Sequence, residues 1–189
     1  MKKSFLFILF LLGTMEIFSQ GMIIDRHTYA LDAGFGVMNI NGKTGAAYNF
    51  GISISGIFDL GVTYSKASAP DDFKSTEGIT GHMDFHMIKD SLFGLALNLA
   101  MSNMNNQSAI LTGSTIYGRF KLSDISHWSL YPSFSAALLT GDEFALGLGF
   151  GLSVEYGISK NISLVLTPGA AGSPENFGYL ITMDFVLKI

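Results

Sequence analysis

The 189-residue chain contains no cysteine, few charged residues and no long apolar segment after its first residues. Without cysteine it can form no disulfide framework, thiolate metal site or lipoprotein anchor. Charged residues make up 14% of the chain, whereas a soluble domain carries about 25–35% on its surface. The formal net charge is −4, and no basic patch points to nucleic acid. The composition therefore disfavours an ordinary soluble domain and a nucleic-acid-binding protein.

The first twenty residues have the features of a secretory signal. Lys2 and Lys3 precede the apolar run Phe5–Leu12, and Glu16 follows it. This run is shorter than the roughly 20 apolar residues that a membrane-spanning helix needs. We therefore expect residues 1–20 to be a signal peptide and residues 21–189 to form one domain.

Apolar residues are abundant in the remaining chain but alternate with small or polar ones. Hydrophobic residues make up 48% of the sequence, with 16 Phe and 7 Tyr, yet no later segment approaches the ~18 consecutive apolar residues of a spanning helix. A period of two indicates β-strands. The alternation predicts ten strands, at roughly 27–38, 46–55, 58–66, 79–88, 92–102, 109–121, 127–139, 145–156, 160–168 and 177–189.

The second face of these strands carries small, neutral residues where a soluble barrel would carry charged ones. In ALGLGFGLSVEYG (145–157), Gly147, Gly149 and Gly151 alternate with leucine and phenylalanine. Glycine weakens a strand, but it fits the crowded interior of a narrow barrel. A lipocalin-like barrel would place its apolar side chains inside and charged ones in water. The sequence instead predicts apolar side chains that face lipid and small ones that face a lumen.

Strand lengths, connections and aromatic positions point to the same architecture. Most predicted strands match the ~9–11 residues that cross a membrane at a tilt. Longer connections, such as 67–78 and 169–176, are predicted at one end and tight turns at the other. Two groups of aromatic residues are predicted to form belts near the two ends: Phe58, Phe93, Phe120, Trp128 and Tyr156, and Tyr48, Tyr64, Phe144, Phe177 and Tyr179. We predict an all-β, antiparallel, up-and-down transmembrane β-barrel of about ten strands, with eight as the alternative.

With this pattern, the chain resembles the small outer-membrane β-barrel (porin-like) proteins of Gram-negative bacteria. The final GYLITMDFVLKI, with Phe185, Leu187 and Ile189 on one face, is similar to the family's C-terminal assembly signal, although an aromatic residue is usual at the last position. The resemblance implies an integral outer-membrane protein with periplasmic termini and extracellular longer loops. It implies contact with outer-membrane lipid and lipopolysaccharide, insertion by the barrel-assembly machinery, and possible outer-membrane protein partners.

One short motif places three titratable residues on the inward face. In HMDFH, His82, Asp84 and His86 alternate with residues that face outward. Two histidines four residues apart on a strand are about 13 Å apart, so one metal ion cannot bind both. We expect a hydrogen-bonded network in the lumen, or a pH-responsive constriction, with no metal and no cofactor.

A second cluster has the residue types of a hydrolytic triad. A hairpin centred near residue 142 would place Ser129 opposite Glu155, with His127 on the same face. His-x-Ser also resembles the signature of outer-membrane lipid A deacylases, but that family's further motif around the serine is absent. Arg119 is expected beside Ser129, where it would pair with Glu155. We therefore favour a polar plug at the periplasmic mouth over an active site.

The candidate functional residues form a predicted polar network in the lumen. They are Asp32, Asp59, His82, Asp84, His86, Arg119, Ser129, Glu155, Asp184 and Lys188. The sequence favours a non-catalytic barrel with a narrow, partly plugged lumen, either a small passive pore or an envelope structural component. The alternatives are an accessory subunit of a larger outer-membrane complex and a lipid-modifying hydrolase.

Overall fold

The computed structural model describes residues 22–40, 43–68, 76–104, 107–122, 127–140, 144–173 and 176–189, and the secondary structure in these ranges is all β. The predicted signal peptide lies outside them. The strands are β1 (Ala30–Ile40), β2 (Lys43–Ile54), β3 (Phe58–Ser68), β4 (Thr76–Lys89), β5 (Phe93–Met104), β6 (Gln107–Gly118), β7 (Phe120–Lys121), β8 (Trp128–Thr140), β9 (Ala145–Gly157), β10 (Ile162–Ser173) and β11 (Asn176–Lys188). Within the described residues, no helix is long and apolar enough to cross a membrane.

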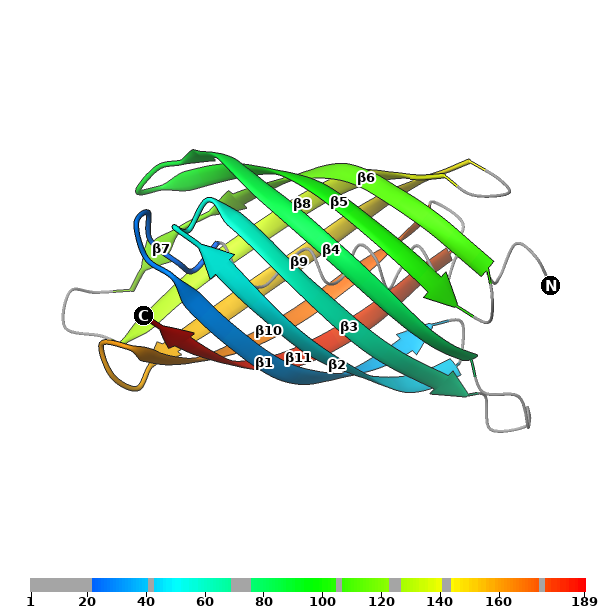
Figure 1. Ribbon diagram of the computed structural model, residues 1–189, viewed down its shortest axis with the longest axis horizontal. Coiled ribbons are helices and arrows are strands. Elements are labelled where there is room, and N and C mark those ends of the chain that lie inside the picture. The colour runs from blue at the N-terminus through cyan, green and yellow to red at the C-terminus, as the bar shows by residue number, and fades with distance from the viewer. Residues whose placement is uncertain are drawn as a thin grey trace.

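The strands form one closed antiparallel sheet (Figure 1). Strands that are neighbours in the chain pair with each other from β1 to β6 and from β7 to β11. The pairing of β1 with β11 and that of β6 with β8 complete the cylinder. The predicted ten-stranded up-and-down barrel is confirmed, because β6 and β7 together make up its sixth strand.

The interruption between β6 and β7 has a local cause in the neighbouring strand. Tyr117 pairs with Ser133 before the break and Phe120 pairs with Leu130 after it, so the register is the same on both sides. Pro132 lies opposite the break and has no N–H to donate to the ladder. The sixth strand is therefore one continuous element with a gap in its hydrogen bonding.

A second proline marks the only gap in the pairing described between β9 and β10. Leu166 pairs with Val154 and Gly169 pairs with Gly151, again in the same register. Pro168 lies between these pairs and faces outward. Because proline cannot donate a backbone hydrogen bond, it is usually confined to the edge strands or bulges of a sheet. Here the flanking pairs keep β9 and β10 in register.

The two faces of the strands are arranged as the alternation predicts. In β9, Leu146 and Phe150 are 59% and 50% exposed, whereas Gly147 and Gly149 are buried. The same alternation runs through the other long strands, whose outward side chains are mainly Phe, Tyr, Leu, Ile, Val and Met. Exposed apolar side chains around the outside of a closed sheet are the arrangement of a barrel surrounded by lipid.

The two ends of the barrel differ in which chain segments they hold. We call the turn end the one with the connections Ser55–Ile57, Asp90–Leu92 and 158–161, residues 22–29 and the C-terminal Ile189, and the opposite one the loop end. Strands β2, β4 and β10 extend beyond their predicted limits towards the loop end. As a result, only two residues separate β1 from β2, β5 from β6 and β10 from β11. The prediction of consistently longer connections at this end was therefore wrong, because segments interpreted as loops continue the ladder.

The first predicted strand also begins later than expected, at Ala30 rather than at residue 27. His27 has a φ of 68°, which is outside the range of a strand, and the N–H of Thr28 donates to the carbonyl of Asp25. The chain thus turns before it enters the sheet. Tyr29 and Ile189 exchange two backbone hydrogen bonds and extend the β1–β11 pairing by one residue.

The aromatic residues predicted for the two belts all lie on the exposed side of the barrel. Near the turn end, the rings of Trp128 and Tyr156 lie 4.8 Å apart across β8 and β9. The rings of Phe58 and Phe85 stack at the same centroid distance across β3 and β4. Such pairs fit the interfacial anchoring of a membrane barrel.

The orientation of the faces predicts opposite effects of substitution inside and outside. Phe150 lies near the middle of β9 and faces outward beside Phe134. The variant Phe150→Lys should lower the free energy of unfolding by about 2–4 kcal/mol, because it places a charge at the bilayer midplane. The measurement is urea unfolding of the protein refolded into lipid vesicles.

Ser135→Ala is the matched control inside the lumen. The Ser135 hydroxyl is buried and has no hydrogen-bond partner within the described structure, so its removal should leave stability unchanged or slightly raised. An equal loss in both variants would contradict the assignment of the two faces.

Candidate functional site in the barrel lumen

Seven of the ten predicted network residues are buried inside the barrel, and the other three are partly exposed at the turn end. The buried residues are Asp32, Asp59, His82, Asp84, His86, Glu155 and Asp184, and the partly exposed ones are Arg119, Ser129 and Lys188. Side-chain hydrogen bonds connect them with neighbouring residues of the wall in four groups, which we describe in turn.

The first group links three strands through His86. Its Nε2 lies 2.7 Å from Asp59 Oδ2, and its Nδ1 lies 2.9 Å from the Tyr117 hydroxyl. A neutral ring satisfies both contacts when Nε2–H donates to Asp59 and Nδ1 accepts from Tyr117. Gly94 makes room for this arrangement, because any Cβ there would overlap the Tyr117 ring. The group fixes β3, β4 and β6 against each other at the turn end.

The second group surrounds Asp84. The Asn98 amide donates to Asp84 Oδ1 at 2.8 Å, and the Thr115 hydroxyl donates to Asn98 Oδ1 at 3.0 Å. These contacts lie side by side on β4, β5 and β6. A carboxylate buried in the lumen is thereby stabilised by a neutral donor chain.

The HMDFH motif points into the lumen as predicted, and His82, Asp84 and His86 are all buried. Asp84 and His86 belong to the different groups above, and the His82 ring lies against Gly61, where a Cβ would overlap it. No group of three or more His, Cys, Asp or Glu side chains among the described residues has the geometry to hold a metal ion.

In the third group, one side-chain amide donates hydrogen bonds to two carboxyl groups. Asn49 Nδ2 lies 2.7 Å from Asp184 Oδ1 and 3.3 Å from Asp32 Oδ2. The Thr182 hydroxyl also donates to Asp184, at 3.0 Å. This group spans the seam where β1 meets β11, so it connects the first and last strands of the barrel through their lumen faces.

The fourth group centres on Glu155 and corrects one predicted ion pair. Glu155 accepts hydrogen bonds from Tyr131 at 2.8 Å, Ser163 at 2.6 Å and Lys188 at 2.7 Å. Arg119, its predicted partner, instead contacts Asp25 Oδ1 at 2.6 Å. The prediction was wrong because Lys121, and not Arg119, pairs with Ser129. Lys188 reaches Glu155 instead, from β11, which lies two strands from β9 along the wall.

The residue types of a hydrolytic triad are close together but do not form its hydrogen-bonded chain. Ser129 lies opposite Glu155 in the β8–β9 register, as predicted. However, the His127 ring packs edge-on against Tyr156 at a centroid distance of 6.2 Å, although His127 also borders the turn-end cavity described below. The Glu155 carboxylate is occupied by the three contacts above, none of them with histidine. The described geometry does not assemble a general base beside Ser129.

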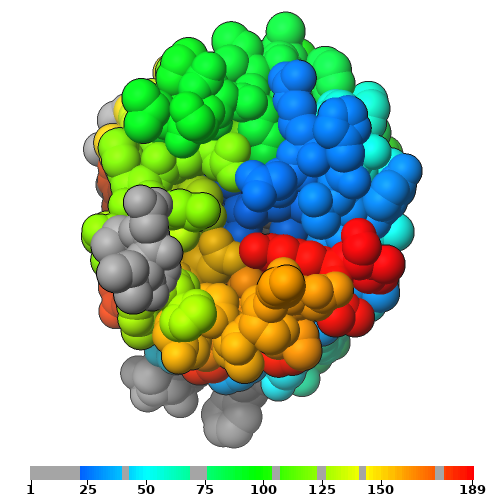
Figure 2. Space-filling model, turned by 90° about the vertical axis from the view of Figure 1, so that its left-hand side faces the viewer, coloured from blue at the N-terminus to red at the C-terminus, as the bar shows by residue number. Residues whose placement is uncertain are grey.

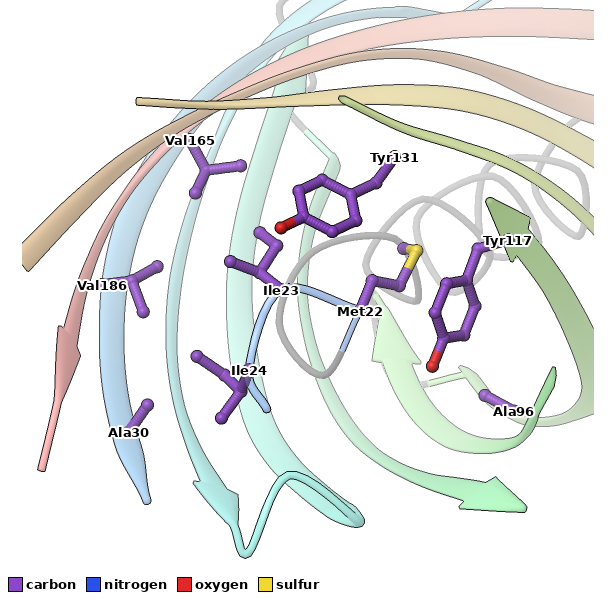
Figure 3. Packing of buried hydrophobic residues seen from close by; sticks show 9 residues of the cluster. All are labelled: Met22, Ile23, Ile24, Ala30, Ala96, Tyr117, Tyr131, Val165 and Val186. Carbon is purple, nitrogen blue, oxygen red and sulfur yellow. The ribbon is translucent and has the colours of Figure 1, made fainter. Parts of the chain in front are cut away.

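An apolar segment that the sequence reading did not identify lies inside the turn end. Met22, Ile23 and Ile24 are 2%, 3% and 0% exposed. They belong to one buried cluster with Tyr117 and Tyr131 from the wall, and with Ala30, Ala96, Val165 and Val186 (Figure 3). Figure 3 shows the three side chains within the ring of strands, between the two tyrosines and the smaller residues of β1, β10 and β11.

Polar contacts hold this N-terminal segment in place. Arg119 contacts Asp25 and also donates to the carbonyl of Asp90 at 3.2 Å. The N–H of His27 donates to the carbonyl of Ser55 at 3.0 Å. The turn Ser55–Ile57 contains Gly56, which has a φ of 58°. Gly56 lies so close to the Asp25 carbonyl that a Cβ would not fit there.

The Asp25–Arg119 pair is charged at neutral pH. Partial desolvation acts to raise the pKa of the Asp25 carboxyl from its ordinary value of 3.8, but the hydrogen bond and positive charge of Arg119 outweigh it, so that the pKa is lowered. Because folding lowers the pKa of Asp25, the ion pair contributes its full stability at pH values above the ordinary pKa of 3.8. This contribution is lost as the pH falls through the lowered pKa.

A cavity of about 720 Å³ opens beside the N-terminal segment at the turn end. Its wall comes from the segment itself, the β4–β5 turn, β7 and the adjoining ends of β8, β9, β10 and β11. Figure 2 looks onto this end, where the blue N-terminal segment and the red end of β11 lie side by side across the mouth. Arg119, Ser129, Glu155 and Lys188 all line this cavity, which is therefore where the predicted mouth residues meet.

The sequence contained part of the information needed to predict the buried cluster at the turn end. The alternation along β6 and β8 places Tyr117 and Tyr131 on the inward face, in phase with Thr115 and Ser133. Met-Ile-Ile at 22–24 is a conspicuous apolar triplet between the predicted signal and the first strand. Its position inside the barrel depends on a chain reversal at His27 that alternation does not encode.

Comparisons with known proteins support the fold. No protein-family model matches the sequence, and neither does any curated protein. Among solved structures, the translocator domain of the autotransporter NalP from Neisseria meningitidis is similar over 93% of this chain and 94% of its own, with a TM-score of 0.55 and 10% identity. The KdgM porin matches 82% of this chain and 98% of its own, with a TM-score of 0.46 and 9% identity. The β-domain of the Bordetella autotransporter BrkA matches 85% and 99%, with a TM-score of 0.48 and 13% identity.

At such low identity, the similarity to the NalP domain shows the fold alone. That fold is a closed antiparallel β-barrel of the outer-membrane type, as the sequence predicts.

The His86 group gives a testable contribution to stability. Tyr117→Phe removes the hydroxyl that contacts His86 and leaves the buried Nδ1 without this partner. We expect the free energy of unfolding in vesicles to fall by about 1 kcal/mol, measured in urea with Trp128 fluorescence. Tyr179→Phe, at an outward position that is 58% exposed, is the matched control and should leave stability unchanged. Equal effects of the two substitutions would contradict this role.

Proposed function

We propose that the protein is a non-catalytic outer-membrane barrel that acts as a small passive pore, with a narrow polar lumen partly plugged at the turn end. The observation that carries this proposal is the burial of Met22, Ile23 and Ile24 inside the ring of strands. Small and hydrogen-bonded polar side chains line much of the remaining lumen wall. Such a lumen favours small polar solutes and excludes large ones.

The contacts of the mouth residues support a structural role rather than catalysis. Glu155 is bonded to Tyr131, Ser163 and Lys188, and the His127 ring is packed on Tyr156. A hydrolase would need a base within hydrogen-bond reach of Ser129. These contacts instead join neighbouring strands across the wall.

We further propose that both termini face the periplasm. The described N-terminal segment and Ile189 lie together at the turn end. The longest connection between strands, residues 69–75, is at the opposite end, and in bacterial outer-membrane barrels the longer loops are extracellular. The exposed apolar belt would contact outer-membrane lipid and lipopolysaccharide. Phe185, Leu187 and Ile189 face outward on the last strand and would present the assembly signal to the barrel-assembly machinery.

Conductance in planar lipid bilayers tests the plug. The wild-type protein should show small or no single-channel steps. Two variants should conduct several-fold more: the triple variant Met22→Gly, Ile23→Gly, Ile24→Gly, which removes the apolar side chains, and Arg119→Ala, which breaks the contact with Asp25. Both should remain folded, because the backbone pairing of the wall does not involve these side chains.

Lys66→Ala is the matched control, since it breaks an ion pair with Glu77 far from the turn end. Its conductance should equal that of the wild type. If the triple variant and Arg119→Ala are as closed as the wild type, the pore is refuted and a purely structural envelope role remains. If the wild type already conducts as well as the variants, the plug is refuted.

A further inference from the structure

The cavity at the turn end contains an excess of hydrogen-bond donors. Both terminal nitrogens of Arg119 are engaged, one by Asp25 and one by the Asp90 carbonyl. Its Nε is buried and has no hydrogen-bond partner in the described structure. A buried guanidinium N–H without an acceptor carries a free-energy cost that a bound acceptor would remove.

Lys121 adds a second cation on the wall of the same cavity. It lies on β7 opposite Ser129, which lines the cavity with it. No described residue forms an ion pair with Lys121. By contrast, Lys188 is already paired with Glu155. The cavity therefore has one cation and one guanidinium N–H that no described acceptor satisfies.

The distribution of charge over the whole barrel reinforces this local excess. The turn end holds six of the eight lysine and arginine residues in the described ranges: Arg26, Lys89, Arg119, Lys121, Lys160 and Lys188. This concentration occurs in a chain with a formal net charge of −4. Asp25, Asp90 and Glu155 lie at the same end, and Asp25 and Glu155 already pair with Arg119 and Lys188. Lys121 is the cation of the cavity lining that such pairs leave available to attract an anion.

We propose that this cavity binds the phosphate group of a small ligand, with Arg119 and Lys121 as its principal contacts. Phosphate supplies several acceptor oxygens and negative charge, which would accept from the free Nε–H of Arg119 and pair with the ammonium group of Lys121. The volume of about 720 Å³ exceeds that of a phosphate ion and lies within the range of about 300–1,000 Å³ typical of small-molecule sites. The phosphate is therefore the charged group of a larger molecule.

Two sources of such a group can reach the turn end. One is a soluble phosphate ester, which would enter the cavity directly from the aqueous side. The other is a phospholipid headgroup, which would reach over the rim beside Phe120 and Trp128, both exposed on the outer surface next to the cavity. The site is independent of whether the lumen conducts.

The test uses the full mature chain refolded in a maltoside detergent, which contains no phosphate. Glycerol 3-phosphate is titrated by calorimetry into the wild type, Lys121→Gln, Arg119→Lys and Lys66→Gln. We expect binding to the wild type, about tenfold weaker binding to Lys121→Gln, and weaker binding to Arg119→Lys, which keeps the charge but loses the planar donors. Lys66→Gln loses the same charge at the other end and should bind like the wild type.

A second arm identifies the source of the phosphate. The same four proteins are incubated with vesicles of phosphatidylglycerol, re-extracted and weighed intact by native mass spectrometry. Retention of lipid by the wild type and its loss in Lys121→Gln would identify a headgroup, whereas calorimetric binding without retained lipid would identify a soluble ester. If neither probe binds, or if all variants bind both alike, the proposal is overturned. Circular dichroism of each variant confirms that the barrel is folded.

Discussion

Closure of the backbone hydrogen-bond ladder is the constraint on which the rest of this structure depends. In a bilayer, an unpaired backbone N–H or C=O has no water to bond and costs several kcal/mol. The pairing of β1 with β11 and of β6 with β8 leaves no free edge among the described strands. Only with both edges paired can the outer face of the described strands be mainly apolar, as it is here.

The interior follows from the same closure. Strands wrapped into a narrow cylinder bring inward side chains from opposite walls close together, so Gly, Ala, Ser and Thr dominate that face. Where larger groups occur, space is made for them: Gly94 accommodates Tyr117, and Gly61 accommodates His82. The buried carboxylates then need donors from neighbouring strands, and Asn49, Asn98, Ser163 and Lys188 supply them.

The alternation in the sequence contains most of the fold, because each residue's face depends only on its parity along a strand. That is why Gly147 and Leu146 could be assigned to opposite sides. The position of the hairpin centre adds the cross-strand register, which is why Ser129 could be placed opposite Glu155. Contacts between strands that are not hydrogen-bonded neighbours are a different kind of information. Lys188 reaches Glu155 past β10, and nothing local to either residue encodes that contact. The burial of Met22–Ile24 likewise depends on a reversal at His27, and the strand ends at the loop end depend on how far each hairpin extends.

The N-terminal segment couples closure of the barrel to the filling of its base. With β6 and β7 counted as one strand, every pairing in the wall joins strands that are neighbours along the chain except the seam between β1 and β11. Residues 22–24 lead into β1, and their side chains share a buried cluster with Val186 of β11. The stretch of chain that seals the cylinder against its last strand is thus also the stretch that fills its base.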